Sequence, residues 1–503
     1  MNTKKADFDC LVRNAGIVRP NRQGTQLADI AILDGCFALV EPNIDPLRSR
    51  QVIDAQGLLA FPGLVDAHTH AGIYSPLAQD ARSESRAAAQ GGVTTMLNYM
   101  RTGQYYLNRG GPYQDFYPRV LDDSRGNYWV DYSYHLAPIA NSHIGEMEDL
   151  LLKQGVPSFK IFMFYGGYGL HGKTGKDAQR DFLMLDDGSS YDIAHFEFIM
   201  REASRLMKAY PQLADSISVS LHCELADILN AYTRLVQQDG GLTGLRAYSA
   251  ARPPHSEGLA IWIAAYLAYE TECLNINLLH LSSRKAVEAA MMMQSLFSHI
   301  NFRREVTIGH LLLDYDSETC CHAKVNPPIR SREDVEFLWE SLLQGDIDWV
   351  VSDHACCSEE LKTEGQDHRD GGNIWLSKSG FGGTEYLLSG LYSEGRKRGL
   401  SLNRMAELLS WQPATRYGLH NKGDIAAGLD ADLVLFDPGQ SFTVRSGESE
   451  SAQGYTPFEG LQLNGKVTST FLRGELVNDR GAIVGSPRGQ YQARPTAGPN
   501  MAP

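Results

Sequence analysis

The chain has 503 residues, a formal net charge of −14, 43% hydrophobic residues and 21% charged residues. This length matches about three ordinary domains or one large α/β barrel with an appendage, and the composition excludes a disordered chain or a small disulfide scaffold. An acidic balance without a basic tract argues against nucleic acid or an anionic membrane as the main partner. No run of residues approaches the ~20 apolar positions of a membrane-spanning helix.

The cysteines and the first residues of the chain indicate the cellular compartment of the protein. Two pairs among the eight cysteines are adjacent, Cys320 with Cys321 and Cys356 with Cys357, and this usage is typical of reduced thiols in the cytosol. Residues 1–7 lead directly into a strand-like segment, so we expect no signal peptide. We therefore expect a large cytoplasmic enzyme.

The two ends of the chain share a strand-and-turn pattern. Residues 8 to about 60 are short β-like runs broken by turns, which predicts a small antiparallel sheet. The pattern returns at 431–437 and 465–474. Because chain ends often lie close together, we expect one small β-sandwich domain built from 1–60 and 421–490. Residues 491–503 are predicted to be a loose tail.

The middle of the chain, 61–420, alternates apolar runs with helix-like stretches, as in βα units. The predicted strands start near Leu64, Val93, Val130, Ser158, Ile217, Ile276, Val306 and Ile347. Eight such strands predict an α/β fold with a (β/α)8 barrel. The long segments 99–119 and 165–191 follow strands, so we expect both to lie over the barrel mouth.

Histidines and an aspartate stand at the ends of four of these strands. His68 and His70 share one face of the first strand, because residues i and i+2 of a strand point the same way. Alone, such a pair is more often structural than metal-binding. However, His222, His280 and Asp353 close three further strands, and barrel strand ends converge on one mouth. Four histidines and an aspartate suit Zn²⁺ or another borderline divalent metal.

Several motifs resemble the cyclic-amide branch of the amidohydrolase superfamily, which comprises hydantoinases, dihydropyrimidinases, allantoinases and dihydroorotases. Besides the strand ends, the resemblance rests on the segments 61–70 (FPGLVDAHTH), 87–95 (AAAQGGVTT), 326–330 (NPPIR), 352–355 (SDHA) and 455–460 (YTPFEG). It covers nearly the whole chain and implies a metal-dependent hydrolase that opens a cyclic amide, imide or ureide.

The resemblance also implies a set of metal ligands. In this family the fourth strand carries a lysine, and Lys160 stands in its place. Reaction with CO₂ would turn Lys160 into N6-carboxylysine, an anionic carbamate that bridges two divalent metals, with Zn²⁺ the metal expected. By resemblance, His68 and His70 bind the first metal, whose shell Asp353 completes. His222 and His280 bind the second.

The family mechanism then assigns two catalytic residues. A water between the two metals loses a proton near neutral pH and becomes the nucleophile. Asp353 takes the second proton of that water and passes it to the leaving nitrogen. Tyr165 matches the family tyrosine that stabilises the oxyanion, with a core tyrosine as the alternative. The family also implies a homotetramer or dimer in which the C-terminal tail packs on a neighbour.

Departures from the family bear on the substrate. Dihydroorotases usually carry an arginine where this chain has Gly72, which argues against ordinary dihydroorotase activity. Hydantoinases and dihydropyrimidinases usually have serine where this chain has Asn326, whose backbone and amide groups could bind a cyclic amide. A simple turn ahead of two prolines is the alternative for Asn326.

Two more positions are candidate substrate contacts. Arg101 follows the second strand and is predicted either to bind an anionic or polar substituent or to be a solvated loop arginine. Segment 380–385 includes Gly382, and its glycines would allow close backbone approach to the substrate ring. A plain turn is the alternative there.

Three functions remain open from the sequence. The leading one is hydrolysis of a cyclic amide, imide or ureide. The second keeps the binuclear site but acts on a linear amide, carbamate or urea. The third is a non-catalytic oligomeric scaffold, as in relatives that have lost metal ligands, whereas this chain keeps all six.

Overall fold

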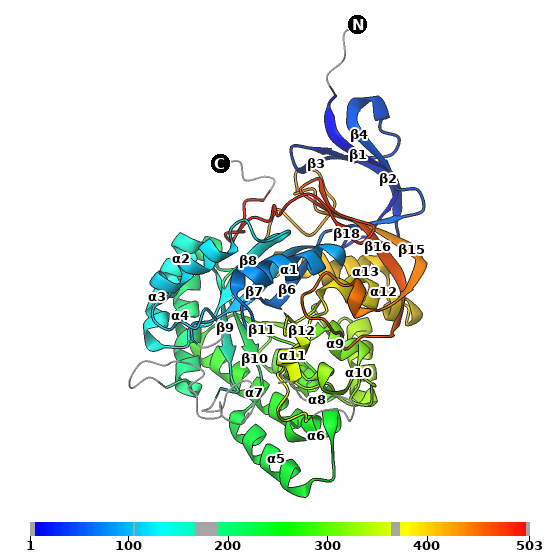
Figure 1. The fold of residues 1–503 in the computed structure, drawn as a ribbon. Coiled ribbons are helices and arrows are strands. Elements are labelled where there is room, and N and C mark those ends of the chain that lie inside the picture. Colours follow the sequence, from blue (N-terminus) through cyan, green and yellow to red (C-terminus); the bar gives the residue numbers. More distant parts are fainter. Residues whose placement is uncertain (1–5, 104–105, 166–189, 364–372, 499–503) are drawn as a thin grey trace.

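A parallel barrel of eight strands, the last of them in two pieces, forms the centre of the computed structural model, which describes residues 6–103, 106–165, 190–363 and 373–498 (Figure 1). Its strands are β6 (Leu64–His70), β7 (Val93–Met100), β8 (Asp131–Leu136), β9 (Ser158–Phe162), β10 (Ser218–His222), β11 (Asn275–Leu278), β12 (Asn301–Thr307), β13 (Trp349–Val351) and β14 (His354–Ala355). Strands such as β7 and β9 are buried along their whole length, because helices cover one face and the barrel interior the other. The predicted (β/α)8 barrel is confirmed.

The eighth strand is split in two. β13 pairs with β12, whereas β14 pairs with β6 and so closes the ring. Between the two pieces, Asp353 adopts a left-handed backbone with φ of 54°. The break therefore lies at one of the residues predicted to hold metal.

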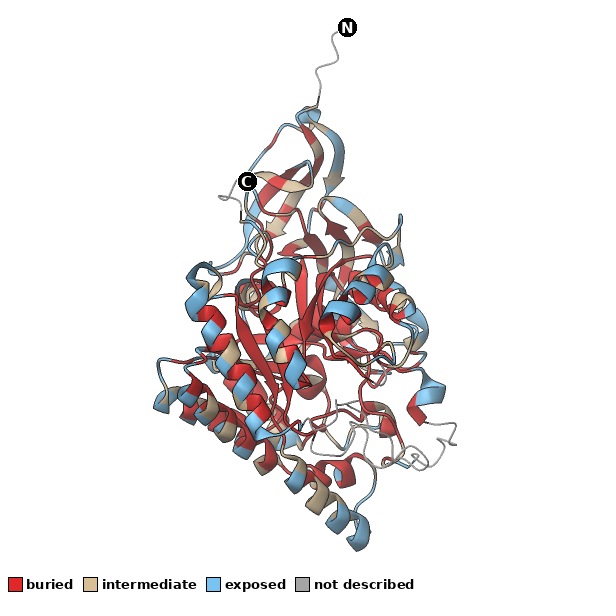
Figure 2. Cartoon of the chain, turned by 90° about the vertical axis from the view of Figure 1, so that its left-hand side faces the viewer, coloured by how far each residue is buried: buried red, intermediate tan, exposed pale blue. Residues whose placement is uncertain are grey.

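Helices surround the barrel, and most of them bury one face against it (Figure 2). They are α1 (Leu77–Gln90), α2 (Tyr113–Ser124), α3 (Asn141–Gln154), α4 (Ile193–Ala209), α5 (Ala226–Asp239), α6 (Gly244–Ala251), α7 (Pro254–Thr271), α8 (Arg284–Leu296), α9 (Ile308–Leu312), α10 (Arg332–Gln344), α11 (Glu359–Thr363), α12 (Leu387–Lys397), α13 (Leu402–Ala406) and α14 (Gln412–Arg416). Within the described part of the chain, no helix has the length and apolar character needed to cross a bilayer.

Both chain ends contribute to a second sheet of nine strands beside the barrel (Figure 1). These are β1 (Phe8–Ile17), β2 (Gln26–Leu33), β3 (Cys36–Glu41), β4 (Ser49–Asp54), β5 (Leu59–Pro62), β15 (Leu433–Thr443), β16 (Gln462–Leu472), β17 (Glu475–Asp479) and β18 (Ala482–Ile483). The predicted union of the two ends is confirmed, since β5 pairs with both β1 and β15. The N-terminal part is not purely antiparallel as predicted: β4 and β5 run parallel to β1, because the connection after β3 brings the chain back to the start of β1.

The tail predicted at 491–503 is not loose over the part that the structure describes. The backbone N–H of Gln492 donates to the carbonyl of Tyr132 at 2.8 Å. Arg494 is buried and donates from Nε to the hydroxyl of Ser133 at 2.9 Å. The tail therefore packs beside β8 of its own barrel, because a buried guanidinium needs the acceptors that this strand supplies.

A buried ion cluster joins the second sheet to the barrel. The ammonium of Lys422 lies 2.8 Å from Asp131 at the start of β8, 2.9 Å from Asp430 and 2.7 Å from Asp432. Burial alone would lower the pKa of Lys422, but the three carboxylates outweigh it and raise the pKa above its usual value. Arg473 adds a second cation beside Asp131. The contact between the second sheet and the barrel therefore depends on ion pairs that are buried away from water.

We expect Lys422→Met to destabilise the protein strongly. It would leave buried carboxylates without their main cation, and breaking a buried pair in this way costs about 3–5 kcal/mol. Urea unfolding followed by circular dichroism measures the loss. The control is Lys397→Met, which removes an exposed pair with Glu394 and should cost less than about 1 kcal/mol. Equal midpoints for the two variants would contradict a stabilising role of the cluster.

Candidate active site

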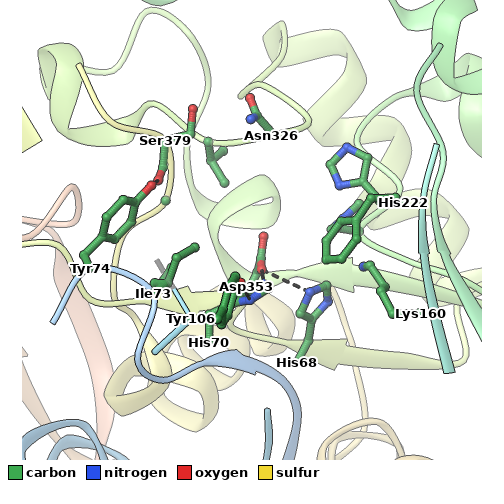
Figure 3. A pocket seen from close by; sticks show the side chains of 15 residues that line it. His68, His70, Ile73, Tyr74, Tyr106, Lys160, His222, Asn326, Asp353 and Ser379 are labelled. Atoms are coloured by element: carbon green, nitrogen blue, oxygen red, sulfur yellow. Dashed lines mark hydrogen bonds and ion pairs between the residues drawn. The ribbon is translucent and has the colours of Figure 1, made fainter. Parts of the chain in front are cut away.

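The six side chains predicted to hold metal lie around one cavity in the barrel mouth (Figure 3). They come from the ends of five strands: His68 and His70 from β6, Lys160 from β9, His222 from β10, His280 from just beyond β11, and Asp353 from just beyond β13. The carboxyl ends of barrel strands face a common mouth, so residues far apart in sequence meet there.

Asp353 connects the two histidines of β6. Its Oδ1 atom lies 3.1 Å from Nε2 of His68 and 3.2 Å from Nε2 of His70. Burial would raise the pKa of Asp353, but these two histidines outweigh it and lower the pKa to about 2. Burial lowers the pKa of His68 well below its ordinary value. An ionised carboxylate and a neutral imidazole are the forms in which both groups bind a cation.

His280 adds a nitrogen that has no partner among the described residues. Its ring centroid lies 4.3 Å from that of His222 and 5.3 Å from that of His68. The Nδ1 atom of His280 is buried and makes no hydrogen bond to any residue that the structure describes. His68, His280 and Asp353 each offer a ligand atom within 4.8 Å of the others. This donor set fits a divalent metal ion, which would satisfy the buried atoms.

Lys160 is buried among aromatic rings. Its Nζ atom lies 4.4 Å from the ring centroid of Tyr99 and 4.9 Å from that of Phe162. Burial lowers the pKa of Lys160 below the usual lysine value, since a charged ammonium is poorly solvated there. A larger fraction of this amine is therefore neutral and nucleophilic than in a surface lysine.

Glu305, on β12, supports the histidines from behind and was not singled out in the sequence. Its Oε1 atom lies 2.7 Å from Nδ1 of His68 and accepts the backbone N–H of His280 at 3.1 Å. Its Oε2 atom accepts the indole N–H of Trp349 at 2.8 Å. The contact at Nδ1 directs Nε2 of His68 toward Asp353. The signal in the sequence was an acidic residue inside a barrel strand.

Glu224 supports His222 in the same way. Its Oε2 atom lies 2.7 Å from Nε2 of His222, and it forms a buried pair with Arg252. Burial would raise the pKa of Glu224, but Arg252 and His222 lower it to about 2, so it is ionised. The Nδ1 atom of His222 is then the nitrogen left for a metal. Glu224 follows His222 by two residues, which was the available signal.

Arg101 and Tyr165 meet beside the cavity, where Arg101 packs against Tyr106 and Tyr165 against Phe162 of the cavity wall. Neither of the two is among the described residues that line the cavity. Arg101 is fully buried and donates from Nε to the hydroxyl of Tyr165 at 3.2 Å. Tyr106 lines the cavity, and its hydroxyl lies 3.3 Å from Nδ1 of His70. Arg101 is thus neither the solvated loop arginine nor, among the described residues, a lining residue of the cavity. Most of the predicted loop at 165–191 lies outside the described residues, as do 104–105 of the loop at 99–119.

The two remaining candidate contacts differ in position. Asn326 lines the cavity, and its Oδ1 atom accepts the hydroxyl of Tyr248 at 2.5 Å. Gly380 lines the cavity as well. Gly382 instead packs behind it, where an added Cβ would lie 2.8 Å from the ring of His354. Glycine is therefore required at 382 by close packing against this histidine.

Comparisons with known proteins agree on the kind of protein. A profile described as "Amidohydrolase family" matches residues 269–477. An allantoinase from Rubrobacter xylanophilus is 32% identical over 491 residues, which cover 96% of this chain and 97% of that protein. A solved dihydropyrimidinase from Brevibacillus agri NCHU1002 has a TM-score of 0.81 at 25% identity, covering 98% of this chain and 99% of that chain. A D-hydantoinase from a Bacillus sp. AR9 has a TM-score of 0.82 at 26% identity, covering 97% and 100%.

Fold and comparisons together define a hydrolase of carbon–nitrogen bonds. The chain belongs to the amidohydrolase family, within the branch that acts on cyclic amides and ureides. These findings confirm the family resemblance that the sequence motifs predicted. They also confirm the predicted reaction type, hydrolysis of a carbon–nitrogen bond in a cyclic amide or ureide. The protein is an enzyme, so the scaffold alternative is wrong.

Proposed function

We propose that this enzyme opens the ring of a cyclic ureide and that it uses two divalent metal ions, for which Zn²⁺ suits the ligands best. His68, His70 and Asp353 would hold one ion and His222 and His280 the other, with Lys160 carrying a carbamate between them. The observation that carries this proposal is the meeting of these six groups around one cavity, with a buried His280 nitrogen that makes no hydrogen bond to any described residue.

Each residue has a defined part in the proposed reaction. When bound, the metals would polarise the scissile carbonyl and lower the pKa of water. Asp353 accepts a proton from the attacking water and returns it to the leaving ring nitrogen, so that water adds across the C–N bond. Tyr165, whose ring packs against Phe162 of the cavity wall, would donate its hydroxyl hydrogen to the oxyanion that forms on the substrate. Asn326 presents its side chain to the amide edge of the ring.

The choice of a ureide rests on the relatives. The chain is 32% identical to the allantoinase from Rubrobacter xylanophilus over nearly its whole length, and its fold matches solved D-hydantoinases. Allantoin and hydantoins share a five-membered ring with the sequence –CO–NH–CO–NH–. We therefore infer that this ring is the preferred substrate, ahead of the six-membered ring of dihydropyrimidines.

A substrate panel tests the proposal. We expect ring opening of allantoin and hydantoin to be faster than that of dihydrouracil, dihydroorotate or a cyclic imide. The loss of ring absorbance measures each rate. Asp353→Asn should lower kcat on every substrate by about 10²–10⁴-fold, because it removes the proton carrier. A linear urea or carbamate hydrolysed faster than any ring would contradict the proposed substrate class.

Metal and carbamate content provide a second test. We expect about two divalent ions per chain by elemental analysis, and a carbamate carbon signal after incubation with ¹³C-bicarbonate. Lys160→Met should abolish the signal and lower the metal content, because methionine cannot form the carbamate. Lys153→Met, at an exposed lysine, is the matched control and should change neither. An unchanged metal content in Lys160→Met would contradict a bridging role.

We also propose that the enzyme is a homo-oligomer, a dimer or tetramer, in a reducing, cytoplasmic compartment. Seven of the eight cysteines are free thiols, which supports the expected compartment. The exposed face of α7 carries Leu259, Trp262, Tyr266 and Tyr269, each 46–57% exposed. Their spacing places them on one side of the helix, and such apolar faces usually mark interfaces. A second copy of the chain is the proposed partner of this face, while the described tail packs on its own barrel.

Light scattering after size-exclusion chromatography tests this interface. We expect a dimer or tetramer for the native chain and a shift toward monomer for Trp262→Glu, because a charge would be buried in the apolar contact. Leu47→Glu is the control, since Leu47 is 90% exposed and lies in the second sheet region. A native chain that is monomeric would refute the proposal, as would an equal shift in both variants.

A further inference from the structure

We propose that Arg101 is a positioning residue that orients the hydroxyl of Tyr165 for the reaction. This inference rests on the proposed function, in which Tyr165 stabilises the oxyanion. It replaces both roles expected for Arg101 from the sequence, a substrate contact and a solvated loop residue.

The placement of Arg101 leaves it little freedom. It follows Met100, the last residue of β7, and is fully buried. Its Nε atom donates to the hydroxyl of Tyr165 at 3.2 Å, and its Nη1 atom donates to the carbonyl of Thr102 at 3.0 Å. A guanidinium held by two directed hydrogen bonds at the end of a rigid strand has a defined orientation.

The chemistry of arginine decides the direction of the bond to Tyr165. A guanidinium can only donate hydrogen bonds, so the phenolic oxygen must accept. The hydrogen of the Tyr165 hydroxyl is therefore turned away from Arg101. A cation beside the oxygen also strengthens the O–H group as a donor, since hydrogen bonds in a chain polarise one another. Both effects favour donation to a developing oxyanion.

Two aromatic rings fix the guanidinium from its sides. Its carbon lies 4.9 Å from the ring centroid of Tyr106 and 5.4 Å from that of Tyr165, distances typical of cation–π contacts. The hydroxyl of Tyr106 in turn lies 3.3 Å from Nδ1 of His70. Arg101 thus lies between the tyrosine proposed to stabilise the oxyanion and Tyr106, which contacts a histidine of the candidate metal centre.

A double-mutant cycle tests this role. The variants are Arg101→Met, Tyr165→Phe and the double variant, assayed on the neutral ring that the native enzyme opens fastest. Arg101→Met should lower kcat by about 10- to 100-fold, as loss of an orienting partner does, with KM nearly unchanged. If Arg101 acts through Tyr165, the double variant should be no slower than Tyr165→Phe alone.

Several results would overturn the proposal. Losses that multiply in the double variant would show that Arg101 acts independently of Tyr165. A Tyr165→Phe variant with native kcat would remove the group that Arg101 is proposed to orient. A loss confined to KM for a carboxylated ring would assign Arg101 to substrate binding instead.

Controls separate this role from folding and from the proposed function. Arg125→Met, at an exposed arginine, should leave kcat unchanged. Metal content should be native in Arg101→Met, whereas failure of the proposed function would show as absent metal or absent ring opening in the native enzyme. If Arg101→Met does not fold, Arg101→Lys completes the same cycle, because lysine keeps the charge but lacks the planar, stacked donor group.

Discussion

The contact of Asp353 with His68 and His70 is the interaction on which the mouth of this barrel depends. The ionised carboxylate of Asp353 is held away from water by His68 and His70, and burial lowers the pKa of His68. Such an arrangement is unfavourable unless other groups compensate it, because buried charge requires pairing. The split of the eighth strand and the left-handed backbone at Asp353 are the local means by which the carboxylate reaches the histidines of the neighbouring strand.

A second layer of hydrogen-bonded carboxyl groups holds this arrangement in place. Glu305 binds His68 from the side opposite to Asp353, and Glu224 does the same for His222 with Arg252 as its counter-ion. Each contact occupies one imidazole nitrogen and leaves the other facing the cavity. The histidines therefore need no rotation before a cation binds, and outer partners of this kind are known to set ligand orientation and basicity.

The barrel and its inner ligands could be predicted because their signals are local. Buried parallel strands such as β7 and β9 are rich in apolar or β-branched residues, and a histidine or aspartate at the end of such a strand is expected at the mouth. Glu305 could not be found in the same way, since an acidic residue in a short strand looks like a solvent-facing position. Its role depends on Trp349 and His68, which only the closed barrel brings near.

Other differences have the same physical origin. The segment around Arg494 is rich in proline and glycine and looks like a free tail, but acceptors on β8 hold it. Arg101 at a strand end looks like a substrate contact, yet it packs against the rings of Tyr106 and Tyr165 and is not among the described residues that line the cavity. In both cases a guanidinium is buried because acceptors or aromatic rings from distant segments of the chain contact it. Such contacts cannot be predicted from the sequence next to the arginine.

The cavity wall itself limits the kind of ring that can bind. Apart from the candidate ligands, its described lining consists mainly of apolar or aromatic groups such as Ile73, Tyr74 and Val325, with Asn326 as a neutral polar group. Among the described lining residues there is no arginine to pair with a substrate carboxylate, and Gly72 stands where such an arginine would be expected. Desolvating an anionic ring here would go uncompensated by any cation outside the candidate metal centre. An uncharged ring with amide edges has no such penalty, since Asn326 can exchange hydrogen bonds with it, and this favours a neutral ureide over a carboxylated one.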